Sequence, residues 1–132
     1  MEYLKKVPIG SEEKYMQAFE KAQDKYAAFG ITTVQEGMLT KELCPLYEEL
    51  IRSGLLRVDV EGYADYNHAD EIYNRLGGDF KHFRLRGIKI FLDGSPQGKT
   101  AFMLQPYEGE KEYRGYPTMK DNEVIGAMEY AA

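Results

Sequence analysis

Residues 87–101 read GIKIFLDGSPQGKTA, and this stretch carries most of the information about the fold. Its first half is a run of β-branched and other apolar residues, which predicts a buried strand over residues 87–94. A Gly-Ser-Pro turn then ends the strand. Lys89 is expected inside the strand and Asp93 at its carboxyl end, where parallel β/α folds gather their active-site residues.

Two more strands precede this one in the sequence. A β-branched run predicts a short strand over residues 31–34, ended by Glu36 and Gly37, and a second strand is expected over residues 55–64. One face of that second strand is apolar and carries Leu56, Val58 and Val60.

Helical patterns alternate with these strands. In the first helix, apolar residues spaced by three and four form one stripe, namely Tyr15, Ala18, Phe19, Ala22, Tyr26 and Phe29. Glycines are expected to end the first two helices. The predicted helices run from Ser11 to the stop at Gly30, from a cap at Thr40 to Gly54 with Pro45 in the first turn, over residues 69–76, and over residues 121–130.

The order of elements predicts an α/β fold with a parallel sheet. Strands that alternate with helices connect by right-handed crossovers, which place the strands side by side and parallel. A complete (β/α)8 TIM barrel needs about 250 residues, whereas this chain has 132. We therefore expect a partial barrel of about three parallel strands over residues 11–132, preceded by an arm over residues 1–10.

Composition excludes several classes of function. The formal net charge is -5, and Lys and Arg do not cluster, which argues against a nucleic-acid or anionic-membrane surface. No apolar run approaches the ~20 residues of a transmembrane helix, and no secretory leader opens the sequence. The single cysteine, Cys44, fits a reducing compartment, so we expect a cytoplasmic protein.

Lys89 has two interpretations at this stage. If its side chain points into a barrel, desolvation favours the neutral amine, which forms Schiff bases or adds carbon dioxide to give a carbamate that bridges two metal ions. If its side chain points outward, it extends its ammonium group into solvent, as strand lysines usually do. Side chains of a strand alternate between its two faces, so a shift of one residue in the strand would move Lys89 from one face to the other.

The remaining reactive side chains favour structural roles. Gly94, Gly98 and Lys99 do not match the phosphate-binding P-loop, because the glycine spacing is one residue short and no clear helix follows. His68 is expected at a helix start and His82 at the surface, and neither stands at the spacing of a metal site.

Three further groups of side chains allow both structural and functional readings. Glu36 and Asp65 fall near strand ends as helix-capping or metal-supporting residues. Cys44 is expected to be a small packing residue. Some of the tyrosines could line a pocket or simply pack, namely Tyr63, Tyr66, Tyr107, Tyr113 and Tyr116.

Several stretches together resemble the amidohydrolase superfamily, in its amidohydrolase-3 branch of metal-dependent hydrolases. They are residues 29–37 (FGITTVQEG), residues 55–58 (LLRV), residues 87–101, Pro106-Tyr107 and residues 115–117 (GYP). The resemblance covers residues 11–130 in order. It implies a distorted barrel with one or two divalent metals, zinc being expected, that activate water to hydrolyse amide or other non-peptide C–N bonds of a small substrate.

By position, Lys89 resembles the family's carboxylated lysine that bridges the metals. Asp93, Gln97 and Glu36 are the further candidates for the rim of the site or its supporting shell. The family's His-x-His pair, its two later histidines and its catalytic aspartate have no counterparts here. A carbamate persists only with its metals, so we expect the chain alone to bind no metal and to be inactive.

Two other interpretations stay open. The chain could be a non-catalytic α/β module that binds a small molecule or a protein. It could also be an assembly module, because a partial barrel exposes sheet edges through which copies self-associate.

Overall fold

The computed structural model describes residues 12–132, apart from the side chain of Glu12, and these residues form two compact units. The first extends to Gly87 and the second begins at Ile88, so the boundary falls within a strand. The predicted arm over residues 1–10 and the predicted helix cap Ser11 lie outside the described residues.

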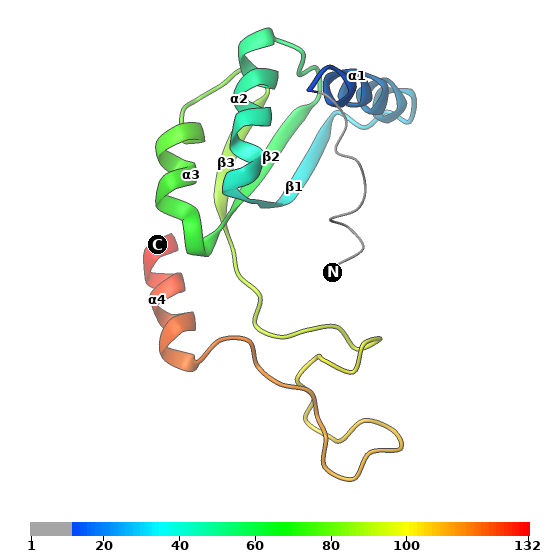
Figure 1. Ribbon diagram of the computed structural model, residues 1–132, viewed down its shortest axis with the longest axis vertical. Helices are drawn as coiled ribbons and strands as arrows, with labels where there is room; N and C mark the ends of the chain where they lie inside the picture. The colour runs from blue at the N-terminus through cyan, green and yellow to red at the C-terminus, as the bar shows by residue number, and fades with distance from the viewer. Residues whose placement is uncertain (1–11) are drawn as a thin grey trace. The chain divides into compact units, whose positions relative to one another are not determined.

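Helices and strands alternate through the first unit, as predicted (Figure 1). In chain order they are α1 (Glu12–Ala28), β1 (Thr33–Leu39), the 3-10 turn η2 (Lys41–Leu43), α2 (Cys44–Ser53), β2 (Asp59–Asp65), the 3-10 turn η3 (Tyr66–His68), α3 (Ala69–Leu76) and β3 (Phe83–Lys89). The strands form a parallel three-stranded sheet in the order β1-β2-β3. The predicted α/β fold is confirmed.

Glycine ends the first two helices of this unit for the reason expected. Gly30 and Gly54 have positive φ angles of 74° and 69°, the left-handed conformation that side chains with a Cβ disfavour. Pro45 occupies the first turn of α2, where its missing N–H leaves no helical hydrogen bond unmade. The expected cap at Thr40 is wrong: Thr40 precedes η2 without a side-chain cap, and Leu43 is the residue before α2.

One face of the sheet is buried and the other is open to solvent. Val60 and Ala64 of β2 are buried together with Phe83 of β3, and so is Val58, which directly precedes β2. Asp59 and Glu61 of β2 and Arg84 and Arg86 of β3 alternate with these residues, and an ion pair joins Arg86 to Glu61 across the strands. The aromatic rings of Tyr47 in α2 and Phe83 are 5.1 Å apart, which places the helices on the buried face. In residues 12–132 the helices pack on one face of the parallel sheet, which is also their place on the outside of a barrel.

The first strand is longer than predicted. Glu36 and Gly37 lie within β1 rather than ending it, and β1 continues to Leu39. A register shift between Glu36 and Leu39 accommodates the extra residues against β2. The β-branched run stops at Val34, so the sequence pattern predicted the end of the strand too early.

The third strand also differs from the prediction, by about four residues. β3 ends at Lys89, so Lys89 is its last residue and Asp93 lies beyond the strand in a loop. The segment Phe83–Arg86 alternates apolar and charged residues because one face is solvated, and this pattern was not recognised as a strand. The neighbouring strand β2 ends at Asp65, so the apolar residues after Lys89 have no strand to pair with on that side.

The second unit consists of a long ordered loop followed by α4 (Asp121–Ala131). Residues 90–120 contain no helix or strand, as expected for residues 95–117. None of the helices in residues 12–132 has the combination of length and apolar character that a membrane-spanning helix requires.

Candidate metal-binding residue at the end of β3

Lys89 lies where a barrel would use it, at the carboxyl end of a parallel strand. Its side chain is half-buried, and its Nζ is 4.8 Å from the centre of the Phe91 ring. An aromatic face attracts the ammonium form of lysine. Carboxylation would replace this ammonium with a carbamate, which has two oxygens available for metal ions.

Asp93 and Gln97 belong to a tightly closed turn that follows β3. The Asp93 carboxylate accepts a hydrogen bond of 2.9 Å from the backbone N–H of Phe102. The hydroxyl oxygen of Thr100 accepts one of 2.9 Å from the N–H of Ser95, while Gln97 lies exposed at the tip. Asp93 therefore has a structural role, because its carboxylate connects the start of the turn to Phe102, which follows the turn.

The glycine-rich motif is explained by this turn rather than by phosphate binding. A Cβ at Gly94 would clash with the hydroxyl of Thr100, so only glycine allows the turn to close. Lys99 pairs with Glu110 at 3.1 Å within the same loop. No helix lies between Thr100 and Asp121, as expected for the segment after Thr100.

Glu36 faces the helix layer, where it meets a residue that sequence reasoning missed. Its carboxylate accepts a 2.9 Å hydrogen bond from the hydroxyl of Tyr47, which is 3% exposed. Burial is the main cause that raises the pKa of the Tyr47 phenol, and the Glu36 carboxylate adds to it. The pair joins β1 to α2. Only the strand register, which the sequence pattern does not supply, brings these two side chains together.

Asp65 and His68 form a second arrangement at a strand end. Asp65 is the last residue of β2 and accepts hydrogen bonds from both nitrogens of Asn67, each at 3.3 Å. Its other oxygen is 2.8 Å from Nδ1 of His68. This is the helix-capping role predicted for Asp65, and His68 stands at the start of α3 as expected. His82 pairs with Asp59 at 2.8 Å, and its ring is half-buried rather than fully at the surface.

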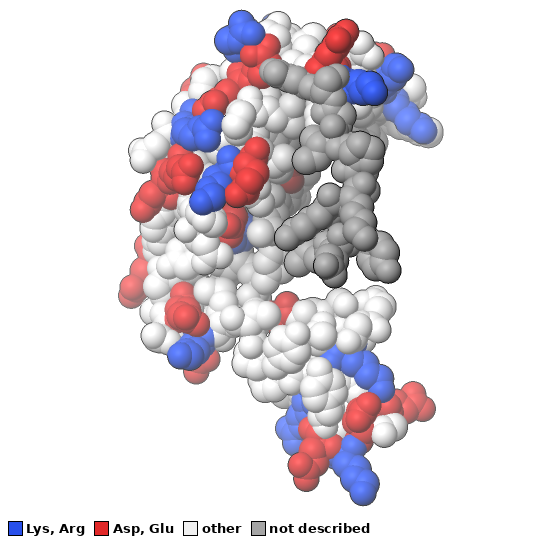
Figure 2. Space-filling view, viewed as in Figure 1, with Lys and Arg blue, Asp and Glu red and all other residues white. Residues whose placement is uncertain are grey.

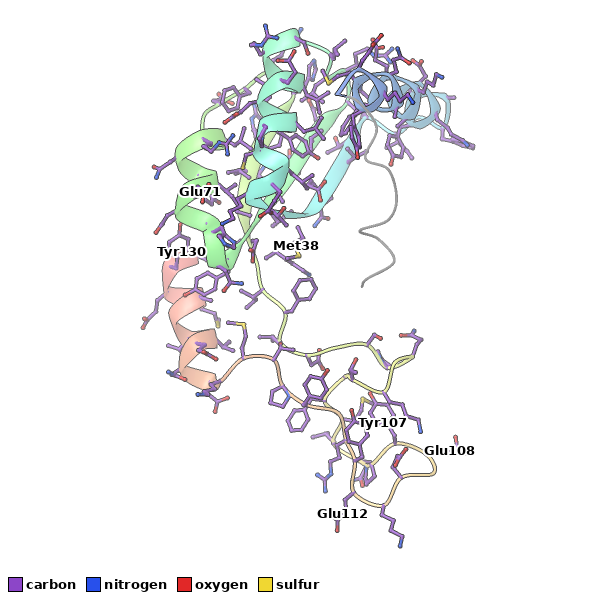
Figure 3. All side chains as sticks on the ribbon, viewed as in Figure 1. Met38, Glu71, Tyr107, Glu108, Glu112 and Tyr130 are labelled. Carbon is purple, nitrogen blue, oxygen red and sulfur yellow. The ribbon has the colours of Figure 1, made fainter. Side chains whose placement is uncertain are left out.

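Two of the five tyrosines contact each other, whereas Tyr116 is 51% exposed, and the single cysteine is buried. Tyr107 and Tyr113 stack at 6.1 Å between ring centres, and the Tyr107 hydroxyl donates to the Ala101 carbonyl (Tyr107 is labelled in Figure 3). Cys44 is fully buried, and burial raises the pKa of its thiol, which disfavours a reactive thiolate.

The donor set of the described residues does not fit a complete metal centre. Residues 13–132 contain no group of three or more His, Cys, Asp or Glu side chains placed to hold one ion. The Asp93 carboxylate accepts from the N–H of Phe102, and the Glu36 carboxylate accepts from the hydroxyl of Tyr47. If Lys89 holds a metal, the other ligands must come from elsewhere.

Residues 2–132 match the model of a family described as the amidohydrolase family. The chain belongs to the amidohydrolase family. The resemblance found in the sequence is thereby confirmed. No curated protein matches the chain.

Two solved structures resemble this amidohydrolase segment. An uncharacterized metal-dependent hydrolase from Pyrococcus furiosus is 25% identical with a TM-score of 0.77, over 92% of this chain and 26% of its own. One from Pyrococcus horikoshii OT3 is 24% identical with a TM-score of 0.78, over 94% of this chain and 26% of its own. The chain thus spans about a quarter of the length of these structures.

Proposed function

We propose that this chain is the segment of a metal-dependent amidohydrolase that supplies Lys89, as a carboxylated lysine, to a metal centre completed by residues outside it. The observation that supports this is the position of Lys89 at the carboxyl end of β3, in a parallel sheet with helices on one face. Zinc is the proposed metal. The reaction of the complete site is hydrolysis of an amide or another C–N bond in a small substrate.

The same proposal makes the isolated chain inactive. One lysine does not hold a metal ion in competition with water, and a carbamate without metals loses carbon dioxide. We further propose that the protein acts in the cytoplasm and does not bind nucleic acid. Positive and negative side chains alternate over α2 and α3 on the face shown in Figure 2, which gives no uniform basic surface there.

A chimera tests the role of Lys89. The matching quarter of the Pyrococcus furiosus hydrolase is replaced by this chain, and bound zinc is measured by mass spectrometry. We expect K89A to lose most of the zinc, and acetate to restore part of it because a small carboxylate can take the place of the carbamate oxygens. K99A is the matched control, since Lys99 pairs with Glu110 in the loop. Equal zinc in K89A, K99A and the parent chimera would refute the proposal.

The second candidate function is an assembly module. It is favoured by the edges of the sheet, where β1 and β3 each have one side without a strand partner in residues 12–132. Such edges favour self-association of the isolated chain. Sedimentation velocity over a hundredfold range of concentration separates the outcomes: a single monomeric species throughout would contradict self-association.

A further inference from the structure

An aspartate and a histidine are paired at the carboxyl end of β2. Oδ2 of Asp65, the last residue of the strand, is 2.8 Å from Nδ1 of His68 in the turn η3 that follows. Oδ1 of the same carboxylate accepts hydrogen bonds from the backbone N–H and the side-chain Nδ2 of Asn67, each at 3.3 Å. Asp65 is buried, so three hydrogen bonds hold its carboxylate in one orientation.

This pairing determines which nitrogen of the His68 ring carries a proton. A carboxylate oxygen can only accept a hydrogen bond, so Nδ1 of the imidazole must be the donor. In the neutral ring Nε2 is then unprotonated and can accept a hydrogen bond. Within residues 12–132 no hydrogen bond engages Nε2, and 38% of the His68 side chain is exposed. The ring is therefore fixed through one nitrogen and accessible at the other.

Helix capping accounts for Asp65 but not for the imidazole of His68. The hydrogen bond from the N–H of Asn67 to the Asp65 carboxylate caps the turn η3. His68 is the residue before α3, where short side chains with an oxygen are preferred because they accept from the free N–H groups of the helix. The His68 side chain makes no hydrogen bond of this kind. Its orientation toward Asp65 therefore needs another explanation.

A second pair of the same kind lies at the other end of β2 and provides an internal comparison. Nδ1 of His82 is also 2.8 Å from a carboxylate oxygen, which belongs to Asp59, the first residue of β2. The Asp59 side chain is 56% exposed, whereas that of Asp65 is 11% exposed. Of the two pairs, the one with the buried carboxylate lies at the edge of the sheet where parallel β/α folds bind their substrates.

We propose that Nε2 of His68 binds the substrate by accepting a hydrogen bond from an N–H group, and that Asp65 is the positioning residue that keeps Nε2 unprotonated. The inference rests on the proposed hydrolase function and names a substrate class for it. An amide that carries an N–H satisfies Nε2, whereas an amide with two carbon substituents on its nitrogen leaves Nε2 without a partner. His68 would thus select primary and secondary amides over tertiary ones.

The first measurement uses the 132-residue chain itself, which has only two histidines. Long-range proton–nitrogen NMR correlations, recorded where the rings are neutral, distinguish protonated from unprotonated ring nitrogens. We expect the proton of His68 on Nδ1, and Asp65→Asn should shift it toward Nε2 because a neutral amide holds Nδ1–H less strongly. Asp59→Asn is the matched control and should alter His82 alone. Glu42→Gln should leave His68 unchanged, because Glu42 of η2 interacts with His68 through its charge and not through a hydrogen bond among residues 12–132.

The second measurement tests the substrate contact in the zinc-loaded chimera of this chain with the Pyrococcus furiosus hydrolase. The probes are acetohydroxamic acid, which has an N–H group, and its N-methyl derivative, which has none and offers the same two oxygens to a metal ion. His68→Asn keeps a donor for Asp65 but removes Nε2. We expect it to weaken binding of acetohydroxamic acid roughly tenfold and to leave that of the N-methyl derivative nearly unchanged.

Controls separate this contact from a general loss of structure. His82→Asn should leave the binding of both probes unchanged, and circular dichroism confirms that each variant folds. Asp65→Asn keeps the imidazole but not its tautomer, so it should reproduce part of the selective loss. It replaces His68→Asn if the latter does not fold.

Three results would overturn the proposal: a His68 ring protonated on Nε2 in the isolated chain, unchanged binding of acetohydroxamic acid in His68→Asn, or an equal loss for both probes. The last result would leave His68 a structural role only. A zinc content that does not depend on Lys89 would instead refute the proposed hydrolase function. The tautomer of His68 is measured without zinc, so the two failures are distinguishable.

Discussion

The two units of the chain are stabilised by different means. Residues 12–87 hold a core of buried apolar side chains from the sheet and its helices, among them Leu50, Ile72 and Phe83. In residues 88–132, only Ala101 and Ala127 are buried apolar side chains, and backbone hydrogen bonds fix the loop instead. Within the motif GIKIFLDGSPQGKTA, residues 90–101 therefore form a loop whose shape is fixed by hydrogen bonds rather than by a buried apolar core.

Core truncation should have the largest effect and should separate the two units. Phe83→Ala removes a ring that is 1% exposed and is expected to lower the free energy of unfolding by ~3–5 kcal/mol. Leu104→Ala in the second unit removes a side chain that is 89% exposed and should change it by less than about 0.5 kcal/mol. Urea denaturation followed by circular dichroism measures both. Similar losses in the two variants would contradict the distinction between the units.

The next largest loss of stability is expected at Gln23 of α1. Its side chain binds the backbone N–H groups of the two residues that precede β2. Its oxygen accepts from the N–H groups of Arg57 and Val58, at 2.6 and 3.3 Å. Gln23→Leu keeps much of the side-chain volume but leaves buried N–H groups unsatisfied, at a cost of ~1–3 kcal/mol. Gln17→Leu is the control, because Gln17 is exposed and its side chain donates to the exposed Glu13. The same denaturation assay decides, and equal stability of the two variants would show that Gln23 does not anchor α1.

A glycine in the second unit tests the loop without touching a core. Gly115 has a φ of 78°, and a Cβ there would clash with the carbonyl oxygen of Ala101. Gly115→Ala is expected to cost ~1–3 kcal/mol of local stability and to accelerate amide exchange at Met103, whose N–H donates to the Arg114 carbonyl. Gly109→Ala has a similar φ of 83° but meets no atoms, so it should have the smaller effect. Faster exchange at Met103 in Gly109→Ala than in Gly115→Ala would contradict this account.

The smallest effect is a dependence of the first unit on acidic pH. The hydrogen bond from Arg75, at 2.7 Å, lowers the pKa of Glu48 below its usual value. The stabilisation is therefore present above the unfolded-state pKa of about 4.3 and is lost as pH falls through the lower folded-state value. Because both side chains are partly exposed, we expect ~0.2–1 kcal/mol. Glu48→Gln should remove this part of the acid dependence, and unchanged curves from pH 6 to 2 would contradict it.

Local sequence patterns predicted which helices and strands exist better than they predicted where each one begins and ends. The glycine stops at Gly30 and Gly54 were predictable, because a positive φ leaves a direct signal in the sequence. The predicted apolar residues Leu56, Val58 and Val60 are buried, but only Val60 lies within β2, which begins at Asp59 rather than at residue 55. The end of β3 was not predictable, because its length is set by the neighbouring strand β2 rather than by its own apolar residues.

The candidate site shows the same limit. The importance of Lys89 came from a family resemblance, and its place at a strand end became apparent only with the true bounds of β3. The sequence pattern singled out Glu36 but not its partner Tyr47, whose hydroxyl donates a hydrogen bond to the Glu36 carboxylate. Asp93 was expected at the end of a strand and instead ties a loop through the N–H of Phe102. Long-range partners such as these depend on register and loop closure, which single-sequence patterns do not encode.

The zinc content of the purified 132-residue chain tests the central claim most directly. The protein is equilibrated with zinc, passed through a metal-free column and analysed by mass spectrometry beside K89A. The account predicts much less than one zinc per chain and no difference between the two proteins, because it assigns the other metal ligands to residues outside this chain. One zinc per chain that disappears in K89A would contradict it.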